Sequence, residues 1–394
     1  MVRAMDLSAE TIAAWVSRLV QIPSVNPLHS GPHAGAAGEK AIATALADWF
    51  PGFGADEVVL DEAAEGRPNV YGFFPGHTSR LVVLDAHTDT VTVENMTDPP
   101  FDGRIEDGHV WGRGALDTKA SMGVMCALLE AWRRTGQRPE PTLLVVGSVS
   151  EEGGGLLGAA RFRTWAESRD LDIDQLVICE PTDCAPIYGH KGGVGLRITV
   201  KGVSAHSSTP EQGANAIVAA ARIILALQNY HDLLVRAPAS TEVGTGTLLT
   251  SMISGGVAGN VVPDRCTFTV GRRIAPGEDP SAEYDRIVEI ASRVSPLPID
   301  HEPAIPPIDD RGPGSPAFYQ SPDSELVRIF AAASGRRPTC APFGTNALRY
   351  DGFAKEKIVF GPGRIEDAHQ ARERVAIADL TRLAEIYTTW LRPH

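Results

Sequence analysis

Histidine and carboxylate side chains recur where buried strands are expected to end. Four short apolar runs predict parallel strands: Leu81–Leu84, Thr142–Val146, Gln175–Cys179 and Lys357–Phe360. The groups that follow them are Asp85, His87 and Asp89, then Glu151 and Glu152, then Glu180, and finally His369. Since the carboxyl ends of such strands meet at one edge of an α/β sheet, these side chains are expected to converge. Imidazole and carboxylate without thiolate suit Zn²⁺ or another divalent first-row metal.

The number of these groups is enough for two metal ions. Two ions about 4 Å apart can share one carboxylate and polarise both a carbonyl group and a water molecule. Five ligands, one of them shared, give each ion three protein ligands and leave open positions for water and substrate. A further carboxylate can act as general base, and the adjacent Glu151 and Glu152 supply both kinds of group. The pattern therefore predicts a dinuclear catalytic centre.

Some of these groups also have plainer interpretations. An acidic pair is usually a solvated face, but Glu151-Glu152 follows a buried strand and precedes Gly153-Gly154-Gly155. His29 and His33 are expected to be surface or loop residues. His190 lies in a Gly-rich segment, so a place in a hinge and a functional role are both open for this histidine.

The pattern around these groups predicts the elements that position them. Ile12–Val20 has helical apolar spacing after a capping Ser8, and a second helix that carries Ile42 is expected to stop at Pro51-Gly52. A third helix, Lys119–Arg133, separates two of the strands. Strands that alternate with helices predict an α/β fold with a mixed, mainly parallel sheet flanked by helices.

One stretch predicts a different sheet. Apolar and polar residues nearly alternate in Val194–Val200 and near Cys266–Val270, and a long apolar helix, Asn215–Gln228, lies between them. An antiparallel, half-exposed sheet fits this pattern. We expect residues 190–305 to form an inserted smaller α/β domain, a lid that also dimerises, and residues 1–189 and 306–394 to form the metal-binding domain. The Pro-rich stretch Pro296–Pro307 is expected to be the return linker.

Composition narrows the class of protein. The chain has 394 residues, 43 % hydrophobic and 22 % charged, which is typical of a globular protein with two domains. A net charge of −13 disfavours binding to nucleic acid. Five scattered cysteines without a CxxC pair favour a reducing, cytoplasmic setting. Met1–Glu10 has no apolar core of a secretory signal, and no run of 18 apolar residues predicts a membrane span.

Five motifs in this order resemble the signatures of one enzyme family. They are His87-Thr88-Asp89-Thr90-Val91, Gly112-Arg113-Gly114 leading to Asp117 and Lys119, Glu151-Glu152, Glu180-Pro181-Thr182, and Ala368-His369. The chain is similar from its first helix to its last to the dinuclear-zinc exopeptidase and deacylase family. That family includes acetylornithine deacetylase, succinyl-diaminopimelate desuccinylase, aminoacylase and bacterial glutamate carboxypeptidase.

The resemblance implies a role for each motif residue. Asp117 bridges two metal ions, His87 and Glu180 complete one of them, and Glu152 and His369 complete the other. Glu151 activates the water and then protonates the leaving amine, while Asp89 orients His87. Zn²⁺ is the expected metal, with Co²⁺ or Mn²⁺ as alternatives.

The resemblance extends to residues that would contact the substrate. His206, in Ser204–Ser208, would help to bind the oxyanion, often across a dimer. Asn260 and Arg273 would bind substrate, since the spacing to Pro276-Gly277 favours Arg273 over Arg272. Asn346 is a further candidate.

Three positions depart from the family's pattern. Gly271 and Asn346 stand where an aspartate is common, and Arg372 stands where an asparagine is usual. None of them belongs to the metal set, but all three bear on the choice of substrate.

The predicted function is deacylation of an N-acyl amino acid by a metal-dependent amidohydrolase similar to acetylornithine deacetylase. The substrate would be a small carboxylate, and the enzyme a homodimer. A dipeptidase or carboxypeptidase of the same family is the alternative. A metal-free binding protein on the same fold is a third hypothesis, which the intact ligand set argues against.

Overall fold

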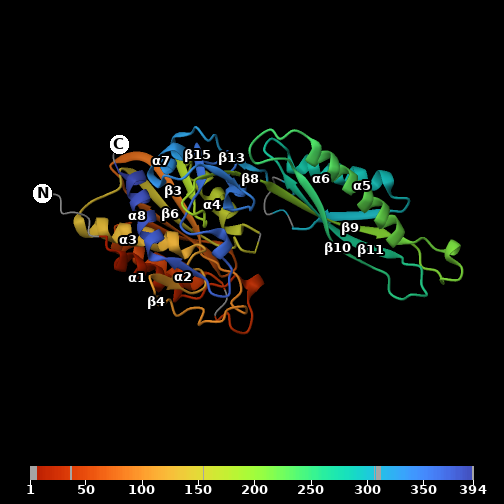
Figure 1. Cartoon of the computed structure of the whole chain (residues 1–394), viewed down its shortest axis with the longest axis horizontal. Helices are drawn as coiled ribbons and strands as arrows, with labels where there is room; N and C mark the ends of the chain where they lie inside the picture. The colour runs from red at the N-terminus through yellow and green to blue at the C-terminus, as the bar shows by residue number, and fades with distance from the viewer. Residues whose placement is uncertain (1–6, 36–37, 154, 306, 308–311, 393–394) are drawn as a thin grey trace. The chain divides into compact units, whose positions relative to one another are not determined.

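The computed structural model describes residues 7–35, 38–153, 155–305, 307 and 312–392. Parts of the N-terminal segment, of the triple glycine at 153–155 and of the Pro-rich stretch lie outside these residues. The chain forms two compact units (Figure 1). The first comprises Met1–Tyr188, Gln320–Thr339 and Thr345–His394, and the second comprises Gly189–Tyr319 and Cys340–Gly344. None of the helices in the described ranges combines the length and apolar character needed to cross a membrane.

The elements up to the second unit include three helices before and between the parallel strands, and one further helix near the start of the chain. They are α1 (Ala9–Val20), η1 (Pro27–His29), α2 (Lys40–Phe53), β1 (Glu57–Ala64), β2 (Arg67–Phe74), β3 (Thr78–His87), β4 (Ile105–Glu106), β5 (His109–Trp111), α3 (Lys119–Thr135), β6 (Pro141–Ser148), α4 (Leu157–Glu167), β7 (Ile173–Ile178) and β8 (Ile187–His190). The elements that follow are β9 (Gly192–Lys201), η2 (Pro210–Gln212), α5 (Ala216–Arg236), β10 (Thr247–Gly255), β11 (Arg265–Ile274), α6 (Pro280–Val294), β12 (Ile299–Pro303), β13 (Phe318–Tyr319), α7 (Glu325–Ser334), β14 (Thr339–Ala341), η3 (Asn346–Arg349), β15 (Glu356–Val359), η4 (Ile365–Asp367), β16 (Arg374–Ala376) and α8 (Ile377–Leu391).

The first unit is built on a mixed sheet flanked by helices. The strand order along this sheet includes β1-β2-β6-β3-β7-β15-β8, in which the neighbours from β6 to β15 run parallel, whereas β1, β2 and β8 are antiparallel. The central strands are buried on both faces, as expected for strands covered by helices. Helices α1, α3 and α8 pack against one another, and α3 contacts β3. The expected α/β fold class is confirmed.

The helix ends show where the sequence pattern was accurate. Ser8 caps α1 by accepting the backbone N–H of Thr11, as predicted. The helix α2 runs one residue past the predicted stop at Pro51-Gly52, because it continues to Phe53 and ends at Gly54, which adopts the left-handed conformation. Proline in a last turn removes only one N–H, and the backbone N–H of Gly54 donates to the carbonyls of Phe50 and Pro51.

The second unit has the expected half-exposed antiparallel sheet. Its strand order is β10-β11-β9-β12, and α5 and α6 pack on the sheet around a core of alternating residues from β9 and β11. The stretch Pro296–Pro307 was predicted to be the return linker, but Ile299–Pro303 within it forms the edge strand β12. Pro303 ends that strand at the sheet edge, where a missing N–H is tolerated.

Candidate metal centre

Three parallel strands of the first unit end beside one another and present the candidate ligands. In the register of β3 and β6, His87 lies opposite Ser148, so the Glu151-Glu152 loop follows β6 directly at the level of His87. Asp85 lies opposite Ile178 of β7, which places Glu180 just past the end of the third strand. The sheet edge therefore brings together the groups that were predicted to meet there.

His87 is buried and has a fixed ring orientation. Its Nδ1 lies 3.0 Å from the backbone carbonyl oxygen of Asp89, which can only accept, so Nδ1 carries the proton and donates. Its Nε2 faces Oδ1 of Asp117 at 3.0 Å. Burial alone would lower the pKa of His87, but the hydrogen bond and charge of Asp117, together with Glu180 and Asp89, raise that pKa well above its ordinary value.

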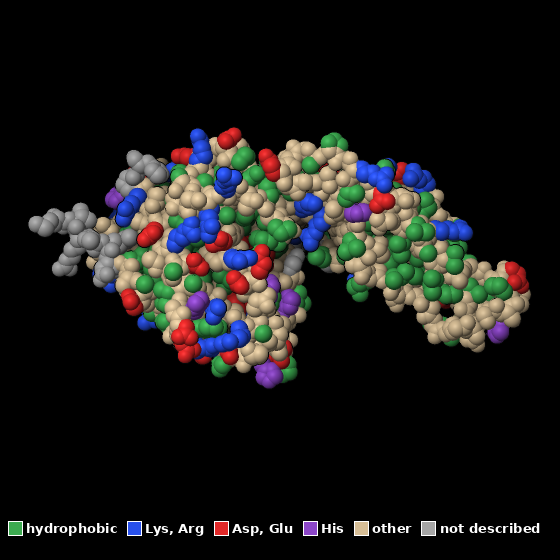
Figure 2. Space-filling model, in the orientation of Figure 1, with side chains coloured by type: hydrophobic (Ala, Val, Ile, Leu, Met, Phe, Trp, Pro, Cys, Tyr) green, Lys and Arg blue, Asp and Glu red, His purple; other side chains and the backbone are tan. Residues whose placement is uncertain are grey.

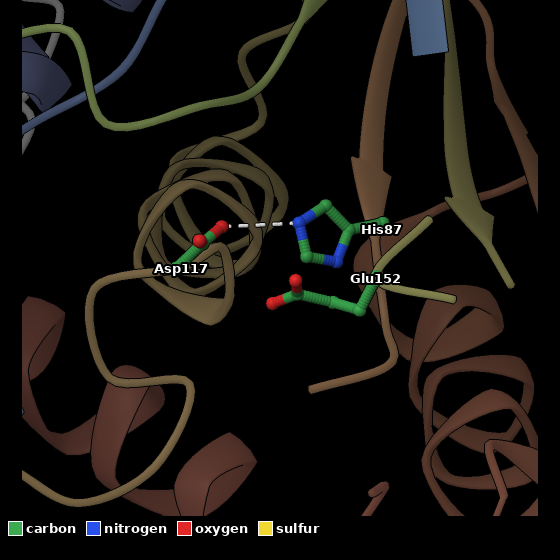
Figure 3. Close-up of side chains that lie close together, drawn as sticks. All are labelled: His87, Asp117 and Glu152. Atoms are coloured by element: carbon green, nitrogen blue, oxygen red, sulfur yellow. Dashed lines mark hydrogen bonds and ion pairs between the residues drawn. The ribbon is translucent and has the colours of Figure 1, made fainter. Parts of the chain in front are cut away.

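Asp117 places one carboxylate between two imidazoles. Its Oδ1 faces His87, and its Oδ2 lies 3.2 Å from Nε2 of His369. Burial would raise the pKa of Asp117, but the hydrogen bonds with the two histidines hold it below its ordinary range. Figure 3 shows the side chains of His87, Asp117 and Glu152 pointing toward a common space. A carboxylate with an imidazole at each oxygen is the arrangement that a bridging ligand requires.

The other carboxylates complete one connected cluster. The ligand atoms of His87, Asp117 and Glu152 lie within 4.8 Å of one another, and so do those of His87, Glu151 and Glu180. Glu152 Oε1 also lies 2.9 Å from Nε2 of His369. These groupings differ from the expected sets, because Glu152 approaches His87 as well as His369 and Glu151 lies among the ligands.

The donor set fits divalent cations. Burial raises the pKa values of Glu152 and Glu180, with the charge of Asp117 adding to both. Burial also raises the pKa of Glu151 to about 8, with His87 opposing and Glu152 reinforcing the shift. Buried carboxylates at this spacing repel one another unless a cation lies between them. Imidazole and carboxylate ligands without thiolate are those that Zn²⁺, Co²⁺ and Mn²⁺ accept.

Asp89 holds two parts of the site together. Its backbone carbonyl fixes His87, while its side-chain oxygens accept the backbone N–H groups of Glu151 and Glu152, each at 3.0 Å. Its carboxylate is 3.6 Å from the His87 ring, so the expected orientation of His87 comes chiefly from the backbone of Asp89. Asn26, which had no predicted role, donates to the same carboxylate at 2.8 Å.

Sequence analysis missed His29 as a neighbour of the centre. The ring Nε2 of His29 lies 3.0 Å from the backbone carbonyl oxygen of Glu152. The short η1 helix that carries it begins at Pro27 and is capped by Asn26, whose Oδ1 accepts the N–H of Leu28. No pattern of residue types marks such a contact, because its partner is the peptide backbone.

Asn346 lies beneath the strand ends. It is buried, and its Nδ2 donates to Oδ2 of Asp85 and to Oγ of Ser148, both at 3.0 Å. Within the described residues its Oδ1 has no hydrogen-bond partner. The departure from aspartate follows from this setting, since a second carboxylate would face Asp85 in a buried site. Both hydrogen bonds of the Asn346 amide nitrogen are therefore made within the protein.

Another departure has a local explanation. Arg372 lies over the Trp111 ring at 4.9 Å and pairs with Asp98 at 3.1 Å. At Gly271, by contrast, an added Cβ would meet nothing within 4 Å, so packing does not require glycine there.

The second unit holds the remaining candidate residues. His206 is exposed, and its Nδ1 bonds to Oγ of Ser208 at 2.7 Å. The backbone N–H of Ser207 donates to the carbonyl of Asn260 at 3.0 Å, so the His206 and Asn260 segments are neighbours. Whether they act together with the metal cluster stays a prediction.

The two adjacent arginines have different environments. Arg272 is buried and paired with Glu278 at 2.7 Å and Glu283 at 2.8 Å. Arg273 is exposed at the end of β11. Of the two, Arg273 is therefore the one that solvent and small molecules can reach.

Comparison with known proteins gives consistent results. The model of the peptidase family M20/M25/M40 matches residues 83–392. The chain is 31 % identical to acetylornithine deacetylase of Myxococcus xanthus, over 84 % of this chain and 85 % of the relative. Aminopeptidase PepT of Bacillus cereus has a similar structure, with a TM-score of 0.75 and 19 % identity over 98 % of both chains. The YXEP protein of Bacillus subtilis, described as a dinuclear metal binding peptidase, matches with a TM-score of 0.67 and 15 % identity over 97 % of this chain and 96 % of that one.

Proposed function

The chain belongs to the peptidase family M20/M25/M40, and from this membership we propose that it removes the acyl group from an N-acyl amino acid. As a member of this family it is a hydrolase of the metallopeptidase and deacylase kind. The observation that carries the proposal is the Asp117 carboxylate between the imidazoles of His87 and His369, with Glu151 beside them.

The proposed ligand assignment uses the whole cluster. His87, Glu180 and Asp117 would hold one ion, and Glu152, His369 and Asp117 would hold the other. When bound, the ions supply Lewis acidity that polarises the amide carbonyl and makes water more acidic. Zn²⁺ is the proposed metal, and Co²⁺ and Mn²⁺ suit the same oxygen and nitrogen donors.

Glu151 is the proposed proton carrier. It takes a proton from the attacking water and delivers it to the amine nitrogen as the amide bond breaks. A general base must lie within reach of the proton that it takes, and a carboxylate oxygen of Glu151 lies within 4.8 Å of ligand atoms of His87 and Glu180. The Asp89 carboxylate keeps Glu151 in place by accepting the backbone N–H of Glu151.

The proposed substrate contacts lie in the second unit. Arg273 would hold the substrate carboxylate as a bidentate cation, Asn260 would donate beside it, and His206 would stabilise the oxyanion. The exposure of Arg273 and His206 and the pairing of the His206 and Asn260 segments support this assignment. Because the chain has a net charge of −13, an anionic substrate needs such a specific cation to bind.

We also propose a cytoplasmic homodimer. The edge strand β10 and the neighbouring helix α5 expose apolar side chains, among them Leu225, Leu233, Leu249, Met252 and Ile253. Hydrophobic side chains are visible on this unit in Figure 2. An exposed apolar edge strand is a ready surface for pairing with a second copy. All five cysteines are free, which suits a reducing compartment.

A substrate screen tests the proposed reaction. The metal-loaded protein would be offered N-acetyl, N-succinyl and N-formyl amino acids and dipeptides, with amine release as the readout. Deacylation that is lost on chelation and absent in Glu151→Gln supports the proposal. Turnover of dipeptides alone would favour a peptidase, the second candidate, to which the similar fold of an aminopeptidase points. No turnover of any amide by protein with two bound metals would overturn both.

A further inference from the structure

The metal cluster is flanked by an ion pair that is sealed inside the first unit. Nη1 of Arg113 lies 2.6 Å from Oε2 of Glu373, and both side chains are almost fully buried. Burial of two opposite charges is costly, and an apolar pair of similar size often stabilises a fold as well. The position of this pair therefore calls for an explanation other than stability.

The carboxylate of Glu373 reaches the backbone of the bridging ligand. Its Oε1 accepts the N–H of Leu116 at 3.1 Å and the N–H of Asp117 at 3.2 Å. These bonds fix the peptide plane from which the Asp117 side chain extends. An apolar residue at 373 would leave both N–H groups buried without these acceptors.

The guanidinium of Arg113 also bonds to the segment that contains Thr92 and Asn95. Its Nε donates to the carbonyl of Thr92, and its Nη2 donates to Oδ1 of Asn95, both at 3.0 Å. Asn95 in turn donates from Nδ2 to the backbone carbonyl of His369 at 3.2 Å. One connected set of hydrogen bonds thus joins the backbones of two candidate ligands that are remote in sequence.

The backbone of His369 needs such support. His369 has a φ of 61°, in the left-handed region that residues other than glycine rarely adopt. That conformation persists only where surrounding contacts hold it. Besides Asn95, the bond from the N–H of Thr97 to the carbonyl of Ala371 pins the same segment.

We propose that Arg113, Glu373 and Asn95 are positioning residues that set the spacing between Asp117 and His369. This spacing matters for the ion that Glu152, His369 and Asp117 would hold, here called the second metal ion. The proposal rests on the metal centre of the proposed function. It assigns these residues no contact with substrate: they act through the backbones of the ligands. Partners of this kind typically change metal affinity by about 10- to 100-fold when they are removed.

The decisive variant is Asn95→Ala, because Asn95 is exposed and its loss leaves the buried ion pair intact. We expect binding of the second metal ion, measured by competition with a chromophoric chelator, to weaken by about 10-fold. The melting temperature of the metal-free protein should stay at the wild-type value. The matched control is Thr97→Ala, whose side chain reaches Ala371 only at 3.5 Å and whose backbone bond remains.

Two further readouts separate positioning from stability. In Co²⁺-substituted protein, Asn95→Ala should shift the visible absorption of the metal and Thr97→Ala should not. Glu373→Gln keeps the size and one acceptor but removes the charge, and it should weaken both metal sites. The inference is overturned if Asn95→Ala binds both ions as tightly as Thr97→Ala, or if Glu373→Gln lowers only the melting temperature. Wild-type protein that binds no metal would instead overturn the proposed function and this inference with it.

Discussion

The Asp89 carboxylate accepts the backbone N–H of Glu151 through Oδ1 at 3.0 Å. The contact ties the proposed base to the end of the strand that carries His87. In Asp89→Asn, only one oxygen remains for the two N–H groups and the Asn26 amide, so the 151–152 loop should loosen. We expect metal affinity to fall by about 10- to 100-fold in titrations against a chelator. The control is Asp61→Asn, which weakens a partly exposed ion pair with Arg161 and should leave metal affinity unchanged.

Glu151→Gln tests the general base. The variant keeps the shape of the side chain and the backbone bond to Asp89, so two metal ions should still bind. Loss of a general base typically costs about 10²- to 10⁴-fold in rate. Steady-state kinetics together with elemental analysis check both parts. A variant with wild-type kcat would show that another group carries the proton.

Removal of the bridge should act differently. Asp117→Ala takes one carboxylate away from two imidazoles at once, so we expect it to lose most bound metal as well as activity. Chelated wild-type protein should be inactive and regain activity with Zn²⁺. Elemental analysis of the wild type should approach two ions per chain, and a value near zero that added metal cannot raise would contradict the dinuclear centre.

The adjacent arginines allow a matched comparison. Loss of a charge-assisted contact costs about 1.5–3 kcal/mol, or roughly 10- to 100-fold in kcat/KM. Arg273→Ala should show this loss on N-acyl amino acids and much less on the corresponding amides, which lack the carboxylate. Arg272→Met leaves Glu278 and Glu283 without their cation, so it should lower stability and affect acid and amide equally. Equal losses for Arg273→Ala would make Arg273 a structural residue.

His190 should make the stability of the fold depend on pH. Burial lowers its pKa to about 4, below the ordinary value of 6.5, with Arg273 adding to the effect. Between these values the unfolded chain binds the proton and the folded chain does not. Stability is therefore full above pH 6.5 and falls by up to about 1.4 kcal/mol per unit as the pH drops toward 4. Urea titrations of chelated protein at several pH values should show this slope in the wild type and a shallower one in His190→Gln. Identical slopes would show that His190 does not contribute to the pH dependence of stability.

The buried strands were predictable, and the edge hairpin was not. The run Leu81–Leu84 marks the centre of β3, because a strand covered on both faces must be continuously apolar. The pattern of β1 and β2 is less clear: in β1 only Asp61 is buried, and β2 includes Pro68 and Gly72. Their pairing is settled by tertiary contacts with α2 and β6, which a local pattern does not contain.

The site divides in the same way. His87, Asp117 and His369 belong to motifs in which residue type and order are both specific. Asn95 and His29 contact backbone carbonyls, so their partners could have any side chain and leave no trace in the sequence. The side-chain contacts of Asp89 also reach backbone N–H groups, which explains why its role was only partly predicted.

The order of the ligands along the chain has a consequence for biosynthesis. His87, Asp117, Glu152 and Glu180 all precede the second unit, and His369 follows it, 189 residues after Glu180. At typical translation speeds of about 5–20 residues per second, the ribosome needs roughly 10–40 s to make that interval. Until the end of this interval the nascent chain carries four of the five proposed ligands, and α8 has not yet been made. The three ligands proposed for one ion, His87, Asp117 and Glu180, are therefore made before the second unit, whereas the site that needs His369 can be completed only after the second unit has been made.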